Sequence, residues 1–256
     1  MADQKITQIQ EGSAIVDADL WAVVQNVSTT PVTRAKTGTL VKSWLKTYLD
    51  TLYVSLTGWR EVSDTWTYAS ASTITIPSDG TTVYQKWMKI RFKQGGGYKY
   101  FIATNVSATL LTVLVNTDHV VANAAITDVA YSFIDNPYGF PHWFAWSPTV
   151  TGFSGTPTAS GLIRISGGNA EIHMNITGTS STTTFTCTNL PIAPNCGWDV
   201  AYLLGESRDN GAFNSPPGRV VVVNGSTTAT FRSTPANGVW TASGTKSAVV
   251  FLSFKV

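Results

Sequence analysis

The sequence predicts a mainly β protein: a short N-terminal hairpin plus helix, a small middle β domain and a C-terminal β-sandwich or jelly roll, assembled as a trimer. Val, Ile and Phe alternate with Thr, Ser and Asn at period two, a pattern typical of strands with one dry face and one hydroxyl-rich face. Only 12% of the 256 residues are Asp, Glu, Lys or Arg, about half the ~25% of ordinary soluble proteins, while apolar residues reach 43%. Such neutral surfaces suit subunit packing or neutral ligands, because little charge is desolvated on burial.

Charge and apolar patterning narrow the classes of partner. The 17 basic residues are scattered and the formal net charge is +2, so we expect no nucleic-acid partner. No apolar run approaches the ~18 to 20 residues that span a bilayer, and Met1 to Lys5 lead into polar sequence rather than an apolar signal core. We therefore expect a chain that folds in a cytoplasm and does not insert into a membrane.

The two cysteines are expected to be free thiols. Cys187 and Cys196 flank a Pro-Ile-Ala-Pro stretch and can in principle close a short loop. Reducing conditions favour two thiols over a bridge. Neither Cys-x-x-Cys nor a Cys/His cluster occurs, so no metal and no cofactor is predicted.

Residues 1–57 contain the predicted hairpin and the only good helix signal. The apolar run Leu20–Val24, a turn at Ser28–Pro31 and the segment Val32–Lys36 indicate the hairpin. From Thr39, a plausible N-cap, apolar residues recur at spacings of four, three and four. This seam consists of Val41, Leu45, Tyr48 and Leu52. The helix is too short to be stable alone, so the seam packs either on its own hairpin or on two symmetry-related copies, and we take it as the candidate oligomer interface.

Residues 58–136 predict a small domain of short strands. One strand, Thr73–Ile76, ends at Pro77, and Met88–Lys93 with Tyr98–Ala103 flank the turn Gly95–Gly97 as a hairpin. No Lys-Ser or Lys-Thr pair follows these glycines, so they are interpreted as a turn rather than a phosphate-binding loop.

Residues 137–148 are predicted to form an aromatic interdomain joint. Prolines and Gly139 preclude a long regular element. The segment is too apolar for an exposed linker, because it holds Tyr138, Phe140, Trp143, Phe144 and Trp146. We expect it to be buried between domains or chains; the alternative is an open aromatic platform for sugars.

Residues 149–256 predict a distal β-sandwich. Leu162–Ile165 and Glu171–Ile176 form one hairpin, and Arg219–Val223 and Thr227–Arg232 form another. In the last strand, one side carries Ala248, Val250, Leu252, Phe254 and Val256, and the other carries Val249, Phe251, Ser253 and Lys255. Six to eight strands in just over a hundred residues fit a sandwich or jelly roll.

Several short motifs, in order, resemble tailed-bacteriophage structural proteins. The N-terminal motifs are Lys5–Ile9, Asp17–Val24 and Thr30–Thr33, followed by the short helix. The middle segment is similar to phage virion proteins through Trp66–Ala71, Ile74–Pro77, Gly97–Phe101, Val121–Thr127 and Asn136–Pro141. More loosely, residues 149–256 resemble the variable distal domains of phage fibres, which are often trimeric jelly rolls. The resemblance implies a virion appendage subunit that attaches to other virion proteins through residues 1–57 and exposes residues 149–256.

Host-surface binding is the function expected of the distal domain, with a glycan or a protein as the receptor. Loops on a rigid sandwich concentrate binding residues, and the candidates are Arg208, Asp209, Asn210, Asn237 and Trp240. Trp240 either stacks on a sugar ring or fills the core, whereas Trp198 is expected in the core. A purely structural head, neck or baseplate protein is the competing hypothesis.

Catalysis is not expected, although a glycan-degrading tailspike remains an alternative. It needs two carboxylates about 5 to 9.5 Å apart. The distal segment offers only Glu171, Asp199, Glu206 and Asp209, and Arg208 between the last two indicates a solvated cluster. No Gly-x-Ser-x-Gly elbow occurs. Glu171 and His173 would share one side of a strand and can share a metal, but an outer-face polar pair is the favoured interpretation.

Overall fold

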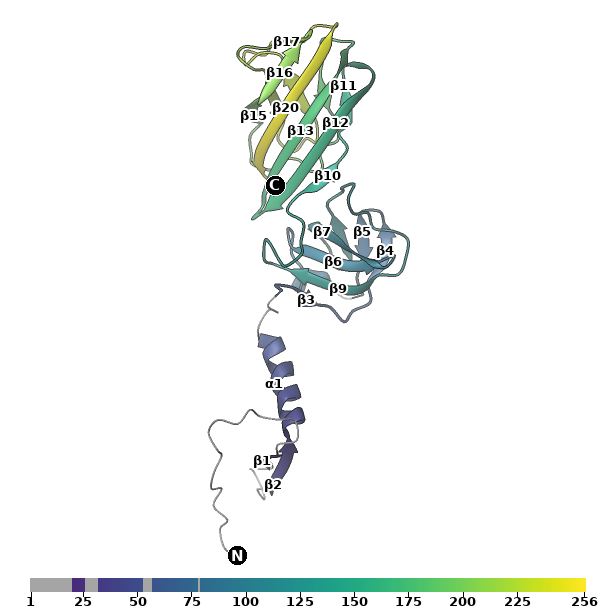
Figure 1. The fold of residues 1–256 in the computed structure, drawn as a ribbon, viewed down its shortest axis with the longest axis vertical. Coiled ribbons are helices and arrows are strands. Elements are labelled where there is room, and N and C mark those ends of the chain that lie inside the picture. The colour runs from purple at the N-terminus through teal and green to yellow at the C-terminus, as the bar shows by residue number, and fades with distance from the viewer. Residues whose placement is uncertain (1–19, 26–31, 53–56, 78) are drawn as a thin grey trace, which may run out of the picture. The chain divides into compact units, whose positions relative to one another are not determined.

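The computed structural model describes residues 20–25, 32–52, 57–77 and 79–256, with side chains described for 42–49, 57–77 and 79–256 (Figure 1). The predicted mainly β class is confirmed, with 47% strand and 5% helix. Two compact units, Met1–Leu56 and Thr57–Val256, divide the chain one residue from the predicted 57/58 boundary. The predicted turn at Ser28–Pro31 and the motif Lys5–Ile9 lie outside the described residues.

The first unit contains the predicted hairpin and helix. Strands β1 (Leu20–Gln25) and β2 (Val32–Thr37) pair antiparallel from Leu20↔Thr37 to Gln25↔Val32. Helix α1 (Gly38–Leu52) follows β2 directly and begins one residue before the predicted N-cap, Thr39.

The helix exposes an apolar face in the single chain. Leu45 and Tyr48 of the predicted seam are 43% and 52% exposed, whereas the side chains of Val41 and Leu52 lie outside the described residues. Off the predicted seam, Trp44 and Leu49 are also exposed, and the Trp44 ring stacks on Tyr48 at 5.9 Å. Although α1 contacts both strands of the hairpin, all of residues 42–49 stay exposed, so this face is not covered by the hairpin.

A seven-stranded antiparallel sheet, here called the middle sheet, begins the second unit (Figure 1). In spatial order it comprises β3 (Arg60–Glu61), β9 (Thr127–Ser132), β6 (Lys89–Gln94), β7 (Gly97–Val106), β8 (Leu110–Val113), β5 (Thr73–Thr75) and β4 (Thr67–Ser70), and a 3-10 turn, η1 (Gly80–Thr82), joins β5 to β6. The predicted hairpin is confirmed as β6–β7, with Gly95 and Gly96 at positive φ in its turn. One face packs on its own core around Trp66, Phe92 and Phe101.

Two antiparallel sheets form the predicted sandwich. The six-stranded sheet has the order β10 (Phe144–Trp146), β12 (Phe153–Ser166), β13 (Asn169–Ser180), β20 (Thr245–Lys255), β16 (Glu206–Asp209) and β17 (Ala212–Phe213). The five-stranded sheet has the order β11 (Val150–Thr151), β14 (Thr186–Cys187), β19 (Ala229–Arg232), β18 (Arg219–Val222) and β15 (Val200–Leu203). Both predicted hairpins are present as β12–β13 and β18–β19. Their inward side chains form one core, which includes Ile172, Val250, Val220 and Phe231.

The last strand, β20, alternates as predicted, with one addition on its buried side. Ala248, Val250, Leu252 and Phe254 are buried, and so is Lys246, at 0% exposure. The Lys246 ammonium donates to the carbonyl oxygens of Gly152, Thr182 and Thr184 at 3.2, 2.9 and 3.2 Å. These acceptors allow a charged group to be buried, while desolvation lowers its pKa.

The aromatic joint is mostly buried inside the second unit. Phe140, Phe144 and Trp146 are at most 9% exposed and belong to a cluster shared by the middle sheet and the sandwich. Tyr138, in contrast, is 79% exposed, and Trp143 is partly buried. An open platform made of the whole segment is therefore excluded.

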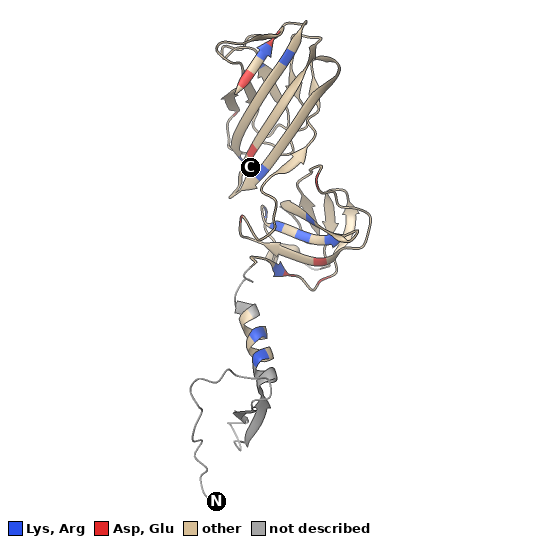
Figure 2. Cartoon of the chain, viewed as in Figure 1, with Lys and Arg blue, Asp and Glu red and all other residues tan. Residues whose placement is uncertain are grey.

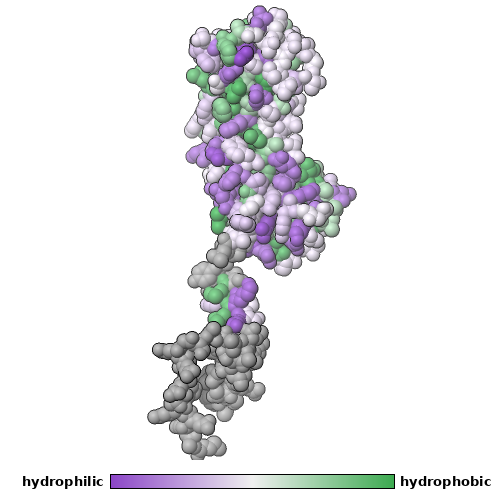
Figure 3. All heavy atoms as spheres, in the orientation of Figure 1, coloured by the Kyte–Doolittle hydropathy of each residue, from purple (hydrophilic) through white to green (hydrophobic). Residues whose placement is uncertain are grey.

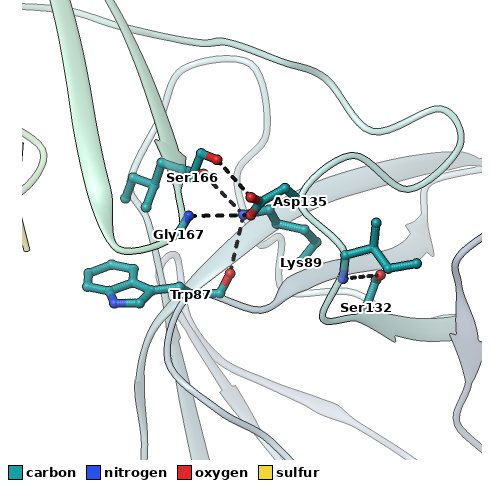
Figure 4. Close-up of polar contacts among 8 residues, drawn as sticks. Trp87, Lys89, Ser132, Asp135, Ser166 and Gly167 are labelled. Carbon is teal, nitrogen blue, oxygen red and sulfur yellow. Dashed lines mark hydrogen bonds and ion pairs between the residues drawn. The ribbon is translucent and has the colours of Figure 1, made fainter.

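A buried lysine ties the middle sheet to the β12–β13 turn (Figure 4). Lys89 is 2% exposed, and its Nζ donates to the carbonyls of Trp87 and Ile165 at 3.3 and 3.1 Å. Asp135 lies 3.6 Å from Nζ and accepts a 2.8 Å hydrogen bond from the Ser166 hydroxyl. That hydrogen bond is the main reason why the pKa of Asp135 is lowered, while burial lowers the pKa of Lys89.

Candidate functional site

The distal sandwich displays Trp198 on a loop whose backbone is held by hydrogen bonds. Trp198 is 69% exposed. Before it, the Asn224 side-chain oxygen accepts from the backbone N–H groups of Cys196 and Gly197 at 3.0 and 3.2 Å. After it, the Asp199 carboxylate accepts from the Asn224 backbone N–H at 3.0 Å. Because the residues before and after Trp198 are hydrogen-bonded to Asn224, the loop that carries the exposed indole is held in place.

Beside Trp198 lies an open hollow of about 440 Å³, here called the Trp198 hollow. It is lined by Asn169, Cys196, Trp198, Asp199, Val200, Ala201, Tyr202, Ser253, Phe254 and Lys255. Tyr202 on β15 is 39% exposed, and its hydroxyl donates to the Ser253 carbonyl on β20. This bond links β15, the edge strand of the five-stranded sheet, to β20 of the six-stranded sheet. The hollow is therefore lined by strands of both sheets as well as by the loop.

The chemistry of the hollow is that of a binding surface. Two exposed aromatic rings offer flat apolar faces, and Asn169 and Lys255 add polar groups at the rim. Asp199 is the one carboxylate among the lining residues, and it already accepts the Asn224 backbone hydrogen bond. The hollow therefore lacks the pair of carboxylates that glycoside hydrolysis uses.

Three of the predicted ligand-binding residues lie on a structured hairpin. Asn210 and Gly211, at φ 51° and 80°, form the turn between β16 and β17. The Arg208 guanidinium lies 3.7 Å from the centre of the Phe213 ring, and its Nε donates to Glu206. The Asp209 carboxylate accepts from both the backbone N–H and the hydroxyl of Thr241. Arg208 and Asp209 thus already have partners within the chain.

The other two predicted residues differ in position. Asn237, at φ 68°, accepts a hydrogen bond from the Arg219 guanidinium. Trp240 is 1% exposed, packs edge-on against Phe185 at 5.3 Å and donates its indole N–H to the Phe231 carbonyl at 3.0 Å. Of the two alternatives for Trp240, the core position is the observed one, and the prediction that it binds a ligand is wrong.

The placement of Trp198 in the core is also wrong. Trp198 is exposed, and Gly197 just before it adopts a positive φ of 85°, which a glycine accommodates without strain. In the sequence, Gly197 is the only local signal of that turn, and it does not tell on which side of the surface the indole lies.

Hydrophobic residues are scattered among pale and hydrophilic ones on the face seen in Figure 3, and an aromatic cluster lies on strands of the six-stranded sheet. The His173 ring lies 4.4 Å from Trp143 and 4.8 Å from Phe251, between centroids. Glu171 lies on the same side of β13 as His173, as predicted, and both of its carboxylate oxygens pair with Arg164 at 2.8 Å. His173 and Glu171 thus have separate partners, and no group of three or more His, Cys, Asp or Glu that could hold a metal is present within residues 57–77 and 79–256.

Both cysteines are thiols in the structure. Cys187 is buried, and desolvation raises its pKa to about 11, whereas Cys196 is partly exposed and contacts the Trp198 carbonyl. Burial also lowers the pKa of His119, which lies among Tyr100, Phe101 and Phe144.

Comparison with family models, with curated proteins and with solved structures matched nothing to this chain. In the part of the chain that the structure describes, no helix has the length and apolarity to cross a bilayer. The proposed function therefore rests on the geometry of the described residues and on the sequence motifs.

Proposed function

We propose that this chain is a fibre-like subunit of a bacteriophage virion appendage, which attaches through residues 1–57 and binds the host surface through the distal sandwich. The observation that carries the binding role is Trp198, 69% exposed on a hydrogen-bonded loop beside a hollow. An exposed indole forgoes the stability that burial would give, so a binding role explains its exposure. The ordered phage-like motifs of residues 5–141 support the appendage role.

A neutral host-surface glycan is the receptor that suits the Trp198 hollow best. Trp198 and Tyr202 offer aromatic faces on which sugar rings stack, and Asn169 with Ser253 offers hydrogen-bonding groups. The opposed single charges of Asp199 and Lys255 give no net field that would select a strongly charged ligand.

We further propose that the subunit is a homotrimer in which α1 contacts its copies. The exposed apolar side chains of Trp44, Leu45, Tyr48 and Leu49 extend the predicted seam to a broad stripe. Apolar stripes of this kind on a short helix are normally covered by a partner.

Light scattering on a sizing column tests the trimer. We expect about three times the 27.5 kDa chain mass, and a lower mass for Leu45→Asp, which introduces a charge into the stripe. Lys46→Asp, on the polar side of the helix, is the control that should remain trimeric. A stable monomer at micromolar concentration contradicts the trimer.

Adsorption tests the appendage role. Fluorescently labelled full chain is mixed with a panel of bacterial strains and with purified envelope polysaccharides, and phage adsorption to each binding strain is then measured in competition. We expect binding to a subset of strains, blocked by their polysaccharide. Absence of adsorption to every strain would favour the purely structural virion protein, and release of oligosaccharide would favour the glycan-degrading alternative.

A further inference from the structure

Strand β6 carries three cations at alternate positions on one face, visible as repeated basic positions along it (Figure 2). Lys89 lies 3.6 Å from Asp135, and Lys93 lies 2.6 Å from Asp128. Between them, Arg91 forms no hydrogen bond or ion pair with any residue of the described ranges, although its flanking cations each have a carboxylate.

Two other arginines differ from Arg91 in their hydrogen-bond partners. Arg91, Arg164 and Arg219 each bury an Nε that lacks a hydrogen-bond partner among the described residues. Nη2 of Arg164 donates to both carboxylate oxygens of Glu171, and Nη2 of Arg219 donates to the side-chain oxygen of Asn237. In these two cases the guanidinium has a side-chain acceptor, whereas the Arg91 guanidinium has none among the described residues.

Aromatic rings nevertheless hold the Arg91 guanidinium in place. Its carbon lies 4.7 Å from the Trp59 ring centre and 5.1 Å from that of Tyr98. Cation–π contact with two aromatic rings restricts the guanidinium without using its N–H groups. The side chain is thus positioned for an acceptor from outside the chain.

A hollow of about 380 Å³ lies at this place, lined by Glu61, Val62, Arg91, Tyr98, Asp128 and Val129. Glu61 on β3 and Arg91 on β6 both pair with Ala130 on β9, so they lie on one row and one face of the sheet. With one strand between them, they are roughly 10 Å apart along that row, which leaves room for a sugar-sized ring. Asp128, at φ 49°, is held at the rim by Lys93.

We propose that this hollow binds a carboxylated sugar, with the carboxylate on Arg91, hydroxyls on Glu61 and Asp128, and the ring against Tyr98. A planar guanidinium without an acceptor matches a carboxylate in a bidentate manner. The two carboxylates of the hollow repel a bare anion but accept hydrogen bonds from hydroxyls, so the ligand must offer both groups. This site lies on the middle sheet and does not depend on the function proposed for the distal sandwich.

Saturation-transfer NMR on the full chain tests the site, with sodium glucuronate, glucose and sodium acetate as probes. We expect transfer to glucuronate, much weaker transfer to glucose and none to acetate at equal concentration. Arg91→Lys keeps the charge but loses the bidentate geometry, and should weaken glucuronate binding about tenfold. Arg164→Lys is the matched control, because that arginine also stacks on a tryptophan, at 4.8 Å, but already has its carboxylate.

The outcomes decide the proposal in either direction. Should Arg91→Lys lower the melting temperature strongly, Glu61→Ala replaces it, since Glu61 is exposed, and glucuronate binding should then weaken by about threefold. Equal binding of glucose and glucuronate, absence of binding, or glucuronate binding unaffected by the working variant overturns the proposal.

Discussion

Two turn-rich segments of the distal sandwich each carry one tryptophan, which is exposed in one segment and buried in the other. In residues 195–199 the indole of Trp198 is 69% exposed, and in residues 233–241 that of Trp240 is 1% exposed. Both segments are rich in Asn, Gly and other polar residues, so local composition does not separate them. The difference lies in the distant groups that hold each backbone.

Backbone hydrogen bonds at Trp240 and at the next residue hold this segment against the sandwich. The Trp240 N–H donates to the Thr183 carbonyl at 3.2 Å, and the next residue, Thr241, is held by Asp209. The Trp198 segment is held instead by Asn224 at the residues before the tryptophan, which leaves the indole itself outside. A tryptophan in a loop is therefore a core residue or a binding residue according to which atoms the fold anchors.

The largest expected difference is in stability. Trp240→Ala removes a fully buried ring and should lower the free energy of unfolding by about 3–5 kcal/mol. Trp198→Ala removes an exposed ring and should change it by less than ~0.5 kcal/mol. Denaturant unfolding measures both, and equal losses would erase the proposed contrast between the two segments.

A smaller effect is expected from the residues that anchor each segment. Asp209→Ala leaves the Thr241 N–H without its partner and should cost about 1–2 kcal/mol of stability, with adsorption retained. Asn224→Ala frees two N–H groups of the Trp198 loop and should cost about 1 kcal/mol, with adsorption lost. If Asp209→Ala is the variant that loses adsorption, the β16–β17 hairpin is the binding surface instead.

The smallest effect is a difference in thiol reactivity. At pH 8, Cys196 beside Trp198 should be alkylated readily, and Cys187 should be protected by burial and by its pKa of about 11. Because this pKa is raised above the ordinary value of 9.0, Cys187 contributes stability that is complete below about pH 9 and is lost as the pH rises toward 11.

Mass spectrometry after alkylation measures the two thiols, and Cys187→Ala should remove that part of the alkaline loss of stability. Rapid labelling of Cys187 in the folded chain at pH 8 contradicts this assignment.

Elements set by local sequence were predictable. The hairpins around Gly95–Gly97 and Asn224–Ser226 follow from turn residues between alternating strands, and α1 follows from apolar spacing. The alternation of β20 likewise predicted its buried face, because a strand has a side-chain period of two.

Features set by distant residues were not predictable. Lys246 is buried because carbonyls more than sixty residues away accept from it, and Trp198 is exposed because Asn224 holds its loop. Arg91 has no acceptor among the described residues because the register of β6 against β9 pairs the Asp128 carboxylate with Lys93 instead. None of these pairings leaves a periodic signal in the sequence.

Contact between the Trp198 hollow and the host surface can be measured by adsorption. The adsorption of the full chain to a binding strain is compared with that of Trp198→Ala and of Tyr138→Ala, whose side chain is 79% exposed but lies on the aromatic joint. We expect Trp198→Ala to lose adsorption by at least ~tenfold, as removal of a central aromatic contact does, and Tyr138→Ala to match the unmodified chain. Undiminished adsorption of a folded Trp198→Ala chain would show that the Trp198 hollow is not the host contact.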